Sequence, residues 1–110
     1  MRKRDVSVEE SSGNIFQDLG LPNAEERLAK AMLSREISRV IDERGLTQAE
    51  AAQLLGASQP DISNIVRGRL SGFALERLAR YLNALGRDVE IRVRPKSDGE
   101  DRGHLRVAVG

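Results

Sequence analysis

The chain has no cysteine and no tryptophan, and its aromatic residues are limited to Phe16, Phe73 and Tyr81. Without cysteine it can form neither disulfides nor thiolate metal sites, which fits a reducing compartment. With so few aromatic rings, its core must be built from Leu, Ile, Val and Ala. It contains neither a signal-peptide stretch nor an apolar run near the ~20 residues that a membrane helix needs. We therefore expect a soluble, cytoplasmic protein.

Arrangements of residues that carry catalysis are also missing. His104 is the single histidine, and the sequence has no Ser/His/Asp set, no glycine-rich phosphate loop and no metal-ligand spacing. The adjacent pairs Glu9-Glu10 and Glu25-Glu26 would point to different faces of a helix, which makes them poor acid–base dyads. We expect no enzymatic activity, no metal and no cofactor, and we interpret His104 as a solvated side chain.

Charge is nearly balanced over the chain, at a formal net of +1, but it is unevenly distributed. Residues 62–96 carry eight basic and three acidic side chains, and 15 of all 18 basic residues are arginine. Arginine suits phosphates and guanine edges, which favours a nucleic-acid partner. A GC-rich genome also produces a high arginine content, so both explanations stay open. We interpret Arg77 and Arg80 as solvent-facing side chains.

Helical periodicity predicts one helical domain over residues 14–87, preceded by a charged, Ser- and Gly-containing arm at 1–13 that we expect to be disordered. Asn23 is expected to cap a helix that ends at Arg44-Gly45. Leucines spaced by three and four residues predict another helix over about 72–85.

The segment 46–68, "LTQAEAAQLLGASQPDISNIVRG", predicts two short helices that meet at Gly56. Thr47 is expected to cap the first helix in a capping box with Glu50, and Ser58 to cap the second. Two short helices joined by a glycine turn match the DNA-binding helix-turn-helix. The alternative is a pair of core helices that never touches nucleic acid.

Polar residues of the second helix would then face the DNA. Gln and Asn pair with adenine, Ser can bond several bases, and a Pro ring can press on a thymine methyl. The helix N-terminus at Ser58 favours a nearby phosphate. Asp61 either completes the cap with Ser58 or accepts a hydrogen bond from a cytosine amine. We favour the cap, since phosphates repel a carboxylate.

After Gly86 the period changes to two. Val89, Ile91 and Val93 alternate with charged residues, and the pattern returns in residues 104–109. We therefore predict a C-terminal two-stranded β-hairpin within 88–110 that packs on the helices or on a second copy of the chain, a possible dimerisation element.

The segment Leu46–Gly68 resembles the lambda-repressor/Cro-type (XRE) helix-turn-helix family without a gap, and "SGFALERLARYLNALG" is similar to its following helix. With the hairpin, the resemblance implies a mainly α, lambda-repressor-like bundle of about four to five helices. It also implies two sets of DNA contacts. The base-reading residues are Gln59, Pro60, Ser63 and Asn64. The phosphate and backbone contacts are Gln48, Ser58, Arg67 and Arg69, with Gln48 also supporting Gln59.

The flanking segments "SSGNIFQDLGLPN", "GRLSGFALERL" and "DVEIRVRP" are similar to those of HigA-type antitoxins. That resemblance implies a repressor that autoregulates a type II toxin–antitoxin operon and neutralises a RelE/HigB-like toxin. One short reading helix makes few base contacts, so we expect a homodimer whose two heads lie about 34 Å apart on a palindromic operator. The alternative function is a protein-interaction module that uses the helices as a scaffold without binding DNA.

Overall fold

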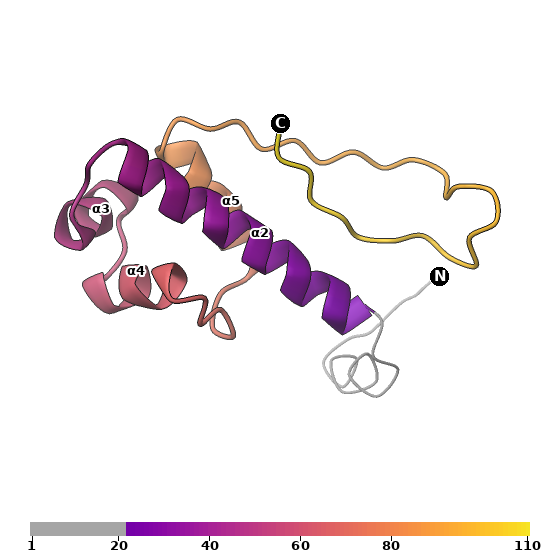
Figure 1. Ribbon diagram of the computed structural model, residues 1–110, viewed down its shortest axis with the longest axis horizontal. Helices are drawn as coiled ribbons and strands as arrows, with labels where there is room; N and C mark the ends of the chain where they lie inside the picture. The colour runs from indigo at the N-terminus through magenta and orange to yellow at the C-terminus, as the bar shows by residue number, and fades with distance from the viewer. Residues whose placement is uncertain (1–21) are drawn as a thin grey trace.

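The computed structural model describes residues 22–110, and the predicted arm at 1–13 lies outside the described residues. The helices of the described part are α2 (Pro22–Glu43), α3 (Gln48–Leu55), α4 (Gln59–Val66) and α5 (Leu75–Ala84). In Figure 1, α3 and α4 gather at one end of the long α2, while residues 87–110 form a wide loop towards the other end. Within residues 22–110, no helix has the length and apolar character of a membrane span.

The hydrophobic core lies where α2 packs against α4 and α5, and where α3 packs against α4. Its most deeply buried side chains are aliphatic, as the scarcity of aromatic residues predicted: Ile37, Val40, Ile62, Ile65 and Leu78. Two aromatic residues, Phe73 and Tyr81, are also buried. This core fixes α4 from two sides, by α2 and by α3.

The predicted caps of the two short helices are confirmed. The Glu50 N–H donates to Thr47 Oγ1 at 3.0 Å and the Thr47 N–H donates to the Glu50 carboxylate at 2.8 Å, which completes a capping box. The Asp61 N–H donates to Ser58 Oγ at 3.1 Å. Gly56 has φ +66°, the left-handed conformation that glycine adopts without strain, and it ends α3 at the corner before α4.

Two other predicted helix starts are wrong. Asn23 is not a cap, because α2 already includes Pro22. The last helix begins at Leu75 rather than near Gly72. Before it, the chain makes a turn in which the Phe73 N–H donates to the Leu70 carbonyl at 3.0 Å, and this turn directs the Phe73 ring into the core.

The predicted C-terminal β-hairpin is wrong, because residues 22–110 contain no strand. No backbone hydrogen bond joins 88–95 to 104–109. The two-residue alternation of apolar side chains determines which of them share a face. It does not provide a surface against which that face can pack. Val107 packs against the helical core, whereas Ile91 is 87% exposed and Val93 is 95% exposed. A two-stranded hairpin with so little support is marginal in water. The rest agrees with an all-α helix-turn-helix fold.

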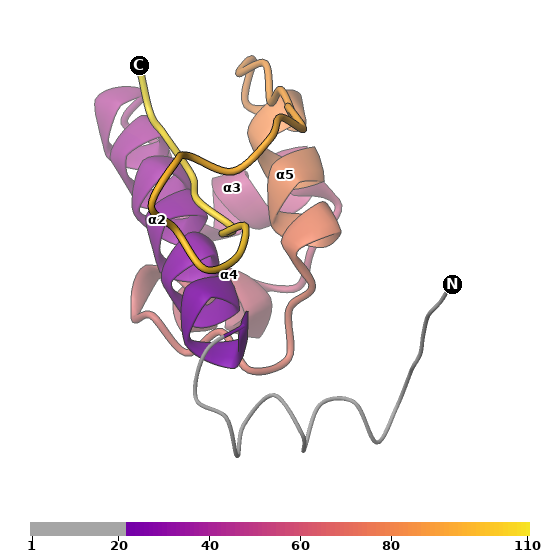
Figure 2. The ribbon, with the colours of Figure 1, turned by 90° about the vertical axis from the view of Figure 1, so that its right-hand side faces the viewer.

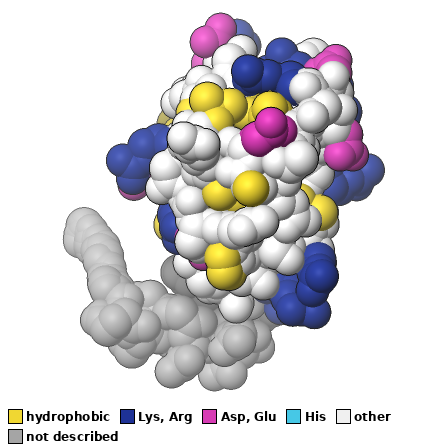
Figure 3. All heavy atoms as spheres, turned by 90° about the vertical axis from the view of Figure 1, so that its left-hand side faces the viewer, with side chains coloured by type: hydrophobic (Ala, Val, Ile, Leu, Met, Phe, Trp, Pro, Cys, Tyr) yellow, Lys and Arg dark blue, Asp and Glu magenta, His cyan; other side chains and the backbone are white. Residues whose placement is uncertain are grey.

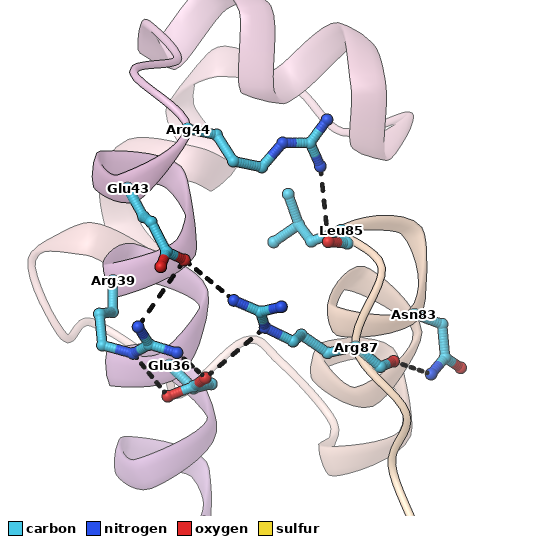
Figure 4. A network of polar contacts seen from close by, with 7 residues as sticks. All are labelled: Glu36, Arg39, Glu43, Arg44, Asn83, Leu85 and Arg87. Carbon is cyan, nitrogen blue, oxygen red and sulfur yellow. Dashed lines mark hydrogen bonds and ion pairs between the residues drawn. The ribbon is translucent and has the colours of Figure 1, made fainter.

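The first residue of the loop 87–110 is attached to the C-terminal half of α2. Arg87 Nη2 donates to Glu43 Oε1 at 2.9 Å, and its Nε lies 3.9 Å from Glu36 Oε2 (Figure 4). Directly after α2, Arg44 Nη1 donates to the carbonyl of Leu85 at 3.4 Å (Figure 4). The end of α5 and the start of the loop are therefore held against the C-terminal half of α2.

A second attachment holds the returning part of the loop on the first turn of α2. The Glu25 carboxylate accepts hydrogen bonds from Arg102 Nη2 at 3.0 Å and from the Leu105 N–H at 3.0 Å. The interpretation of His104 as a solvated side chain is wrong. Its Nδ1 lies 2.5 Å from Glu25 Oε2 and its Nε2 lies 2.6 Å from Glu100 Oε1. The hydrogen bonds from Arg102, His104 and Leu105 lower the pKa of Glu25 from 4.5 to about 2.

Candidate nucleic-acid interface

The corner between α3 and α4 brings two short helices into close contact. Ala51 and Ala52 are both buried, and small side chains at these positions let α4 cross close to α3. The Ala57 N–H donates to the Ala52 carbonyl at 2.9 Å and fixes the turn after Gly56. On the other side of the turn, Ile62 and Ile65 are almost fully buried and seat α4 in the core.

The four predicted base-reading residues share the face of α4 that points away from this core. Successive residues of a helix are rotated by about 100°, so these four fall within an arc of about 140° opposite the two buried isoleucines. Gln59 and Pro60 are exposed, and Ser63 and Asn64 are half-buried. The structure thus brings these residues together on one accessible surface.

Three of the predicted phosphate-contacting residues lie at or just beyond the ends of α4, and the fourth lies at the start of α3. Gln48 is exposed at the first position of α3, and Ser58 is exposed at the N-cap of α4. At the other end of α4, Arg67 and Arg69 are exposed in a turn whose Arg69 N–H donates to the Asn64 carbonyl at 2.8 Å. Ser58 and the two arginines therefore flank the predicted base-reading face at opposite ends of α4.

At the end of the molecule formed by α3 and α4, charged side chains lie mainly at the edge of the surface. In Figure 3, which views this end directly, Lys and Arg side chains stand around the edge together with several Asp and Glu side chains, and apart from one acidic group most of the centre is uncharged or hydrophobic. A phosphate backbone requires cations, whereas base edges require neutral hydrogen-bonding groups and apolar contacts. The cations at the edge could meet phosphates and the neutral centre could meet base edges, while the acidic side chains between them would not favour phosphate.

Arg77 has a role that the sequence analysis missed. Although its side chain is 40% exposed, its Nη2 donates to Asp61 Oδ2 at 2.7 Å and its Nε donates to the Tyr81 hydroxyl oxygen at 2.7 Å. Its guanidinium also lies over two rings, 4.8 Å from the centroid of Phe73 and 5.5 Å from that of Tyr81. Arg77 therefore ties the first turn of α4 to α5.

The contact with Arg77 also completes the interpretation of Asp61. Its backbone N–H serves the cap with Ser58, as expected, while its carboxylate binds Arg77 and is neutralised there. Burial lowers the pKa of Arg77, but the hydrogen bonds with Tyr81 and Asp61 outweigh this and raise the pKa above its ordinary value. The spacing of four residues between Arg77 and Tyr81 is the sequence signal that could have suggested half of this contact.

Comparison with known proteins agrees with this geometry. Residues 15–94 match the sequence profile of the family "Helix-turn-helix domain". A solved structure whose name places it among XRE-family transcriptional regulators is 42% identical to the chain, with a TM-score of 0.75. The match covers 81% of this chain and 100% of the other. The chain belongs to the XRE-type helix-turn-helix family. No protein with a curated description gives a significant match to this XRE-type chain.

Proposed function

We propose that the protein is a sequence-specific DNA-binding transcriptional regulator, acting as a repressor, that reads operator DNA with α4. The observation that carries this proposal is the accessible polar face of α4. The opposite face of the same helix is held in the core by Ile62 and Ile65. The similar solved protein, named as a transcriptional regulator, supports the same function. The protein would act in the cytoplasm and would need no cofactor or catalytic step.

Each polar group of the interface then has a defined task. The base edges of the major groove are read by a set of four side chains: Gln59, Pro60, Ser63 and Asn64. The phosphates on either side are bound by a second set: Gln48, Ser58, Arg67 and Arg69. Since Arg77 neutralises the Asp61 carboxylate, this acidic group repels the phosphates less than an unpaired carboxylate would.

Specificity would come from two copies of this head. One eight-residue helix contacts only a few base pairs, whereas a homodimer on a palindromic operator doubles the contacts. We propose that the two α4 helices occupy successive major grooves, about 34 Å apart.

The test is a binding titration of the purified chain with DNA from its own upstream region. Gln59→Ala and Asn64→Ala are expected to weaken specific binding by about 1–3 kcal/mol. Arg69→Ala should weaken binding to all sequences and reduce the dependence on salt by about one counterion. Gln53→Ala, at an exposed position of α3 outside both sets, is the matched control. If the Gln59 and Asn64 variants bind like the control, α4 is not the reading helix.

We further propose that the repressor is the antitoxin of a type II toxin–antitoxin operon and binds a RelE/HigB-like toxin. The similarity of its flanking segments to HigA-type antitoxins supports this role. A small toxin-like reading frame next to the gene, whose product inhibits growth alone but not with this chain, is the expected finding. Without such a neighbour, the protein is an ordinary regulator.

The second candidate function is a protein-interaction module that does not bind DNA. The exposure of Ile91 and Val93 favours it, since exposed apolar side chains on an extended segment are suited to a protein partner. A chain that shows no salt-dependent binding to its own promoter, yet co-purifies with its genetic neighbour, would establish this second function and exclude the first.

A further inference from the structure

The outgoing part of the C-terminal loop, residues 88–94, has unused binding capacity. Its backbone N–H and C=O groups form no hydrogen bond with the backbone of residues 22–110. Two of its apolar side chains are almost completely exposed, Ile91 at 87% and Val93 at 95%. An extended segment with free backbone groups can accept another strand at its edge.

The loop that carries this segment is attached to α2 at two places. At its start, Arg87 is bound to Glu43 and lies near Glu36 on α2. On the return, Arg102 and His104 are bound to Glu25 at the beginning of α2. In Figure 2 the loop lies in front, with α3 and α4 behind it, so a partner on the loop leaves the α3–α4 end free.

The charges of this segment are complementary to those of a second, antiparallel copy of it. In the sequence "DVEIRVR", two acidic residues precede Ile91 and two basic residues follow it at matching distances. If two copies run antiparallel about a two-fold axis at Ile91, residues whose numbers add up to 182 face each other. The facing pairs are Asp88 with Arg94, Glu90 with Arg92, Val89 with Val93, and Ile91 with Ile91.

The side chains on the two faces of the paired segments also agree with this antiparallel pairing. Facing residues of an antiparallel pair point to the same side, so one side carries four ion pairs and the other carries only Val and Ile. Within one chain, Arg92 Nη2 already lies 3.6 Å from Glu90 Oε1, as expected if the two side chains share a side. Pro95, which has no N–H, ends the pairing directly after Arg94.

We propose that residues 88–94 are a dimerisation segment, and that its partner is the same segment of a second copy, paired antiparallel about Ile91. This inference rests on the homodimer of the proposed function and gives its surface and register. It differs from the intrachain hairpin that the structure lacks, because both segments of the pair come from 88–94 and none from 104–109.

The first test exchanges charges in the full chain and measures its mass in solution by sedimentation equilibrium. The double variant Arg92→Glu/Arg94→Asp makes the segment entirely acidic, and Asp88→Arg/Glu90→Arg makes it entirely basic. Each alone should dimerise at least about tenfold more weakly than the wild type, since four attractive pairs become repulsive. Mixing the two variants should restore a heterodimer. Asp98→Lys/Asp101→Lys, in the exposed turn of the loop, is the control and should dimerise normally.

The second test measures the register and uses the absence of cysteine from the natural chain. Under mild oxidation, Ile91→Cys should form a disulfide dimer, since facing Cα atoms are about 4.5–5.5 Å apart, within disulfide range. Val93→Cys is the matched control, because its own copy would lie about 14 Å away along the pair.

Both tests work without DNA, so their outcome is independent of whether the protein is a repressor. A monomeric wild-type chain, a dimer that all charge variants retain, or a disulfide that forms at position 93 as readily as at 91 would each overturn the proposal. Loss of DNA binding in the Gln59 and Asn64 variants with an intact dimer would leave it standing.

Discussion

The contact between Arg77 and Asp61 gives the sharpest prediction about stability. Arg77→Met keeps most of the aliphatic stem but removes the guanidinium, and with it the hydrogen bonds to Asp61 and Tyr81 and the stacking over Phe73. Because this side chain connects α4 to α5, its loss should destabilise the fold and loosen the start of α4.

The expected cost follows from the geometry. The side chains of Arg77 and Asp61 are 40% and 30% exposed, so solvent screens their ion pair and its worth stays near ~1 kcal/mol. The cation–π contacts add about 0.5–1 kcal/mol at such a partly exposed site. The hydrogen bond to Tyr81 adds about 1 kcal/mol, so the sum is about 2–3 kcal/mol, or roughly 10–15 °C in Tm for a domain of this size.

Urea unfolding followed by circular dichroism measures this cost, and Arg80→Met is the matched control. Arg80 lies on the same helix, is 69% exposed, and only approaches Glu76 at 3.8 Å, so its loss should cost less than about 0.5 kcal/mol. A double-mutant cycle with Asp61→Asn should give a coupling energy of about 1 kcal/mol. Equal stability of the Arg77 and Arg80 variants, or additive effects in the cycle, would refute the proposed link between α4 and α5.

Three further predictions concern local features. Thr47→Ala removes the acceptor of the capping box and should cost about 1 kcal/mol in urea unfolding, whereas Thr47→Ser should restore most of it. Gly56→Ala should cost about 1–2 kcal/mol, since φ +66° disfavours any Cβ although no atom lies within 4 Å of it; a neutral result would mean that the corner is not left-handed in solution. The pKa of Glu25 is about 2 when folded and 4.5 ordinarily, so its contacts should stabilise the loop fully above pH 4.5 and be lost as the pH falls towards 2. The Leu105 amide shift should follow this titration and lose it in Glu25→Gln.

The parts of the fold that sequence reasoning predicted correctly are those fixed by neighbours in the chain. The capping box at Thr47, the cap at Ser58 and the turn at Gly56 each depend on residues within about four positions. The buried stripe of α4 also follows from spacing alone, because Ile62 and Ile65 fall on one side of any helix that starts at Ser58.

Apart from the two helix starts at Asn23 and Gly72, the parts that were wrong depend on partners far away in the sequence. Arg77 contacts a carboxylate 16 residues earlier, and His104 contacts one 79 residues earlier, so no local pattern indicates either pair. The alternation in 88–95 indicates only which side chains would share a face of an extended segment, and it cannot show whether a partner strand lies in the same chain. For the same reason, the candidate interface could be placed on α4 from sequence, while its support by Arg77 could not.

The most direct test of DNA reading by α4 is a ¹⁵N NMR titration of the full chain with a duplex from its own upstream region. The predicted result is that the largest amide shifts cluster at Thr47 and Gln48 and across residues 58–69, at salt-dependent affinity. If these amides stay unchanged while only residues 88–110 respond, or if no amide responds to any upstream duplex, α4 is not a DNA-reading helix.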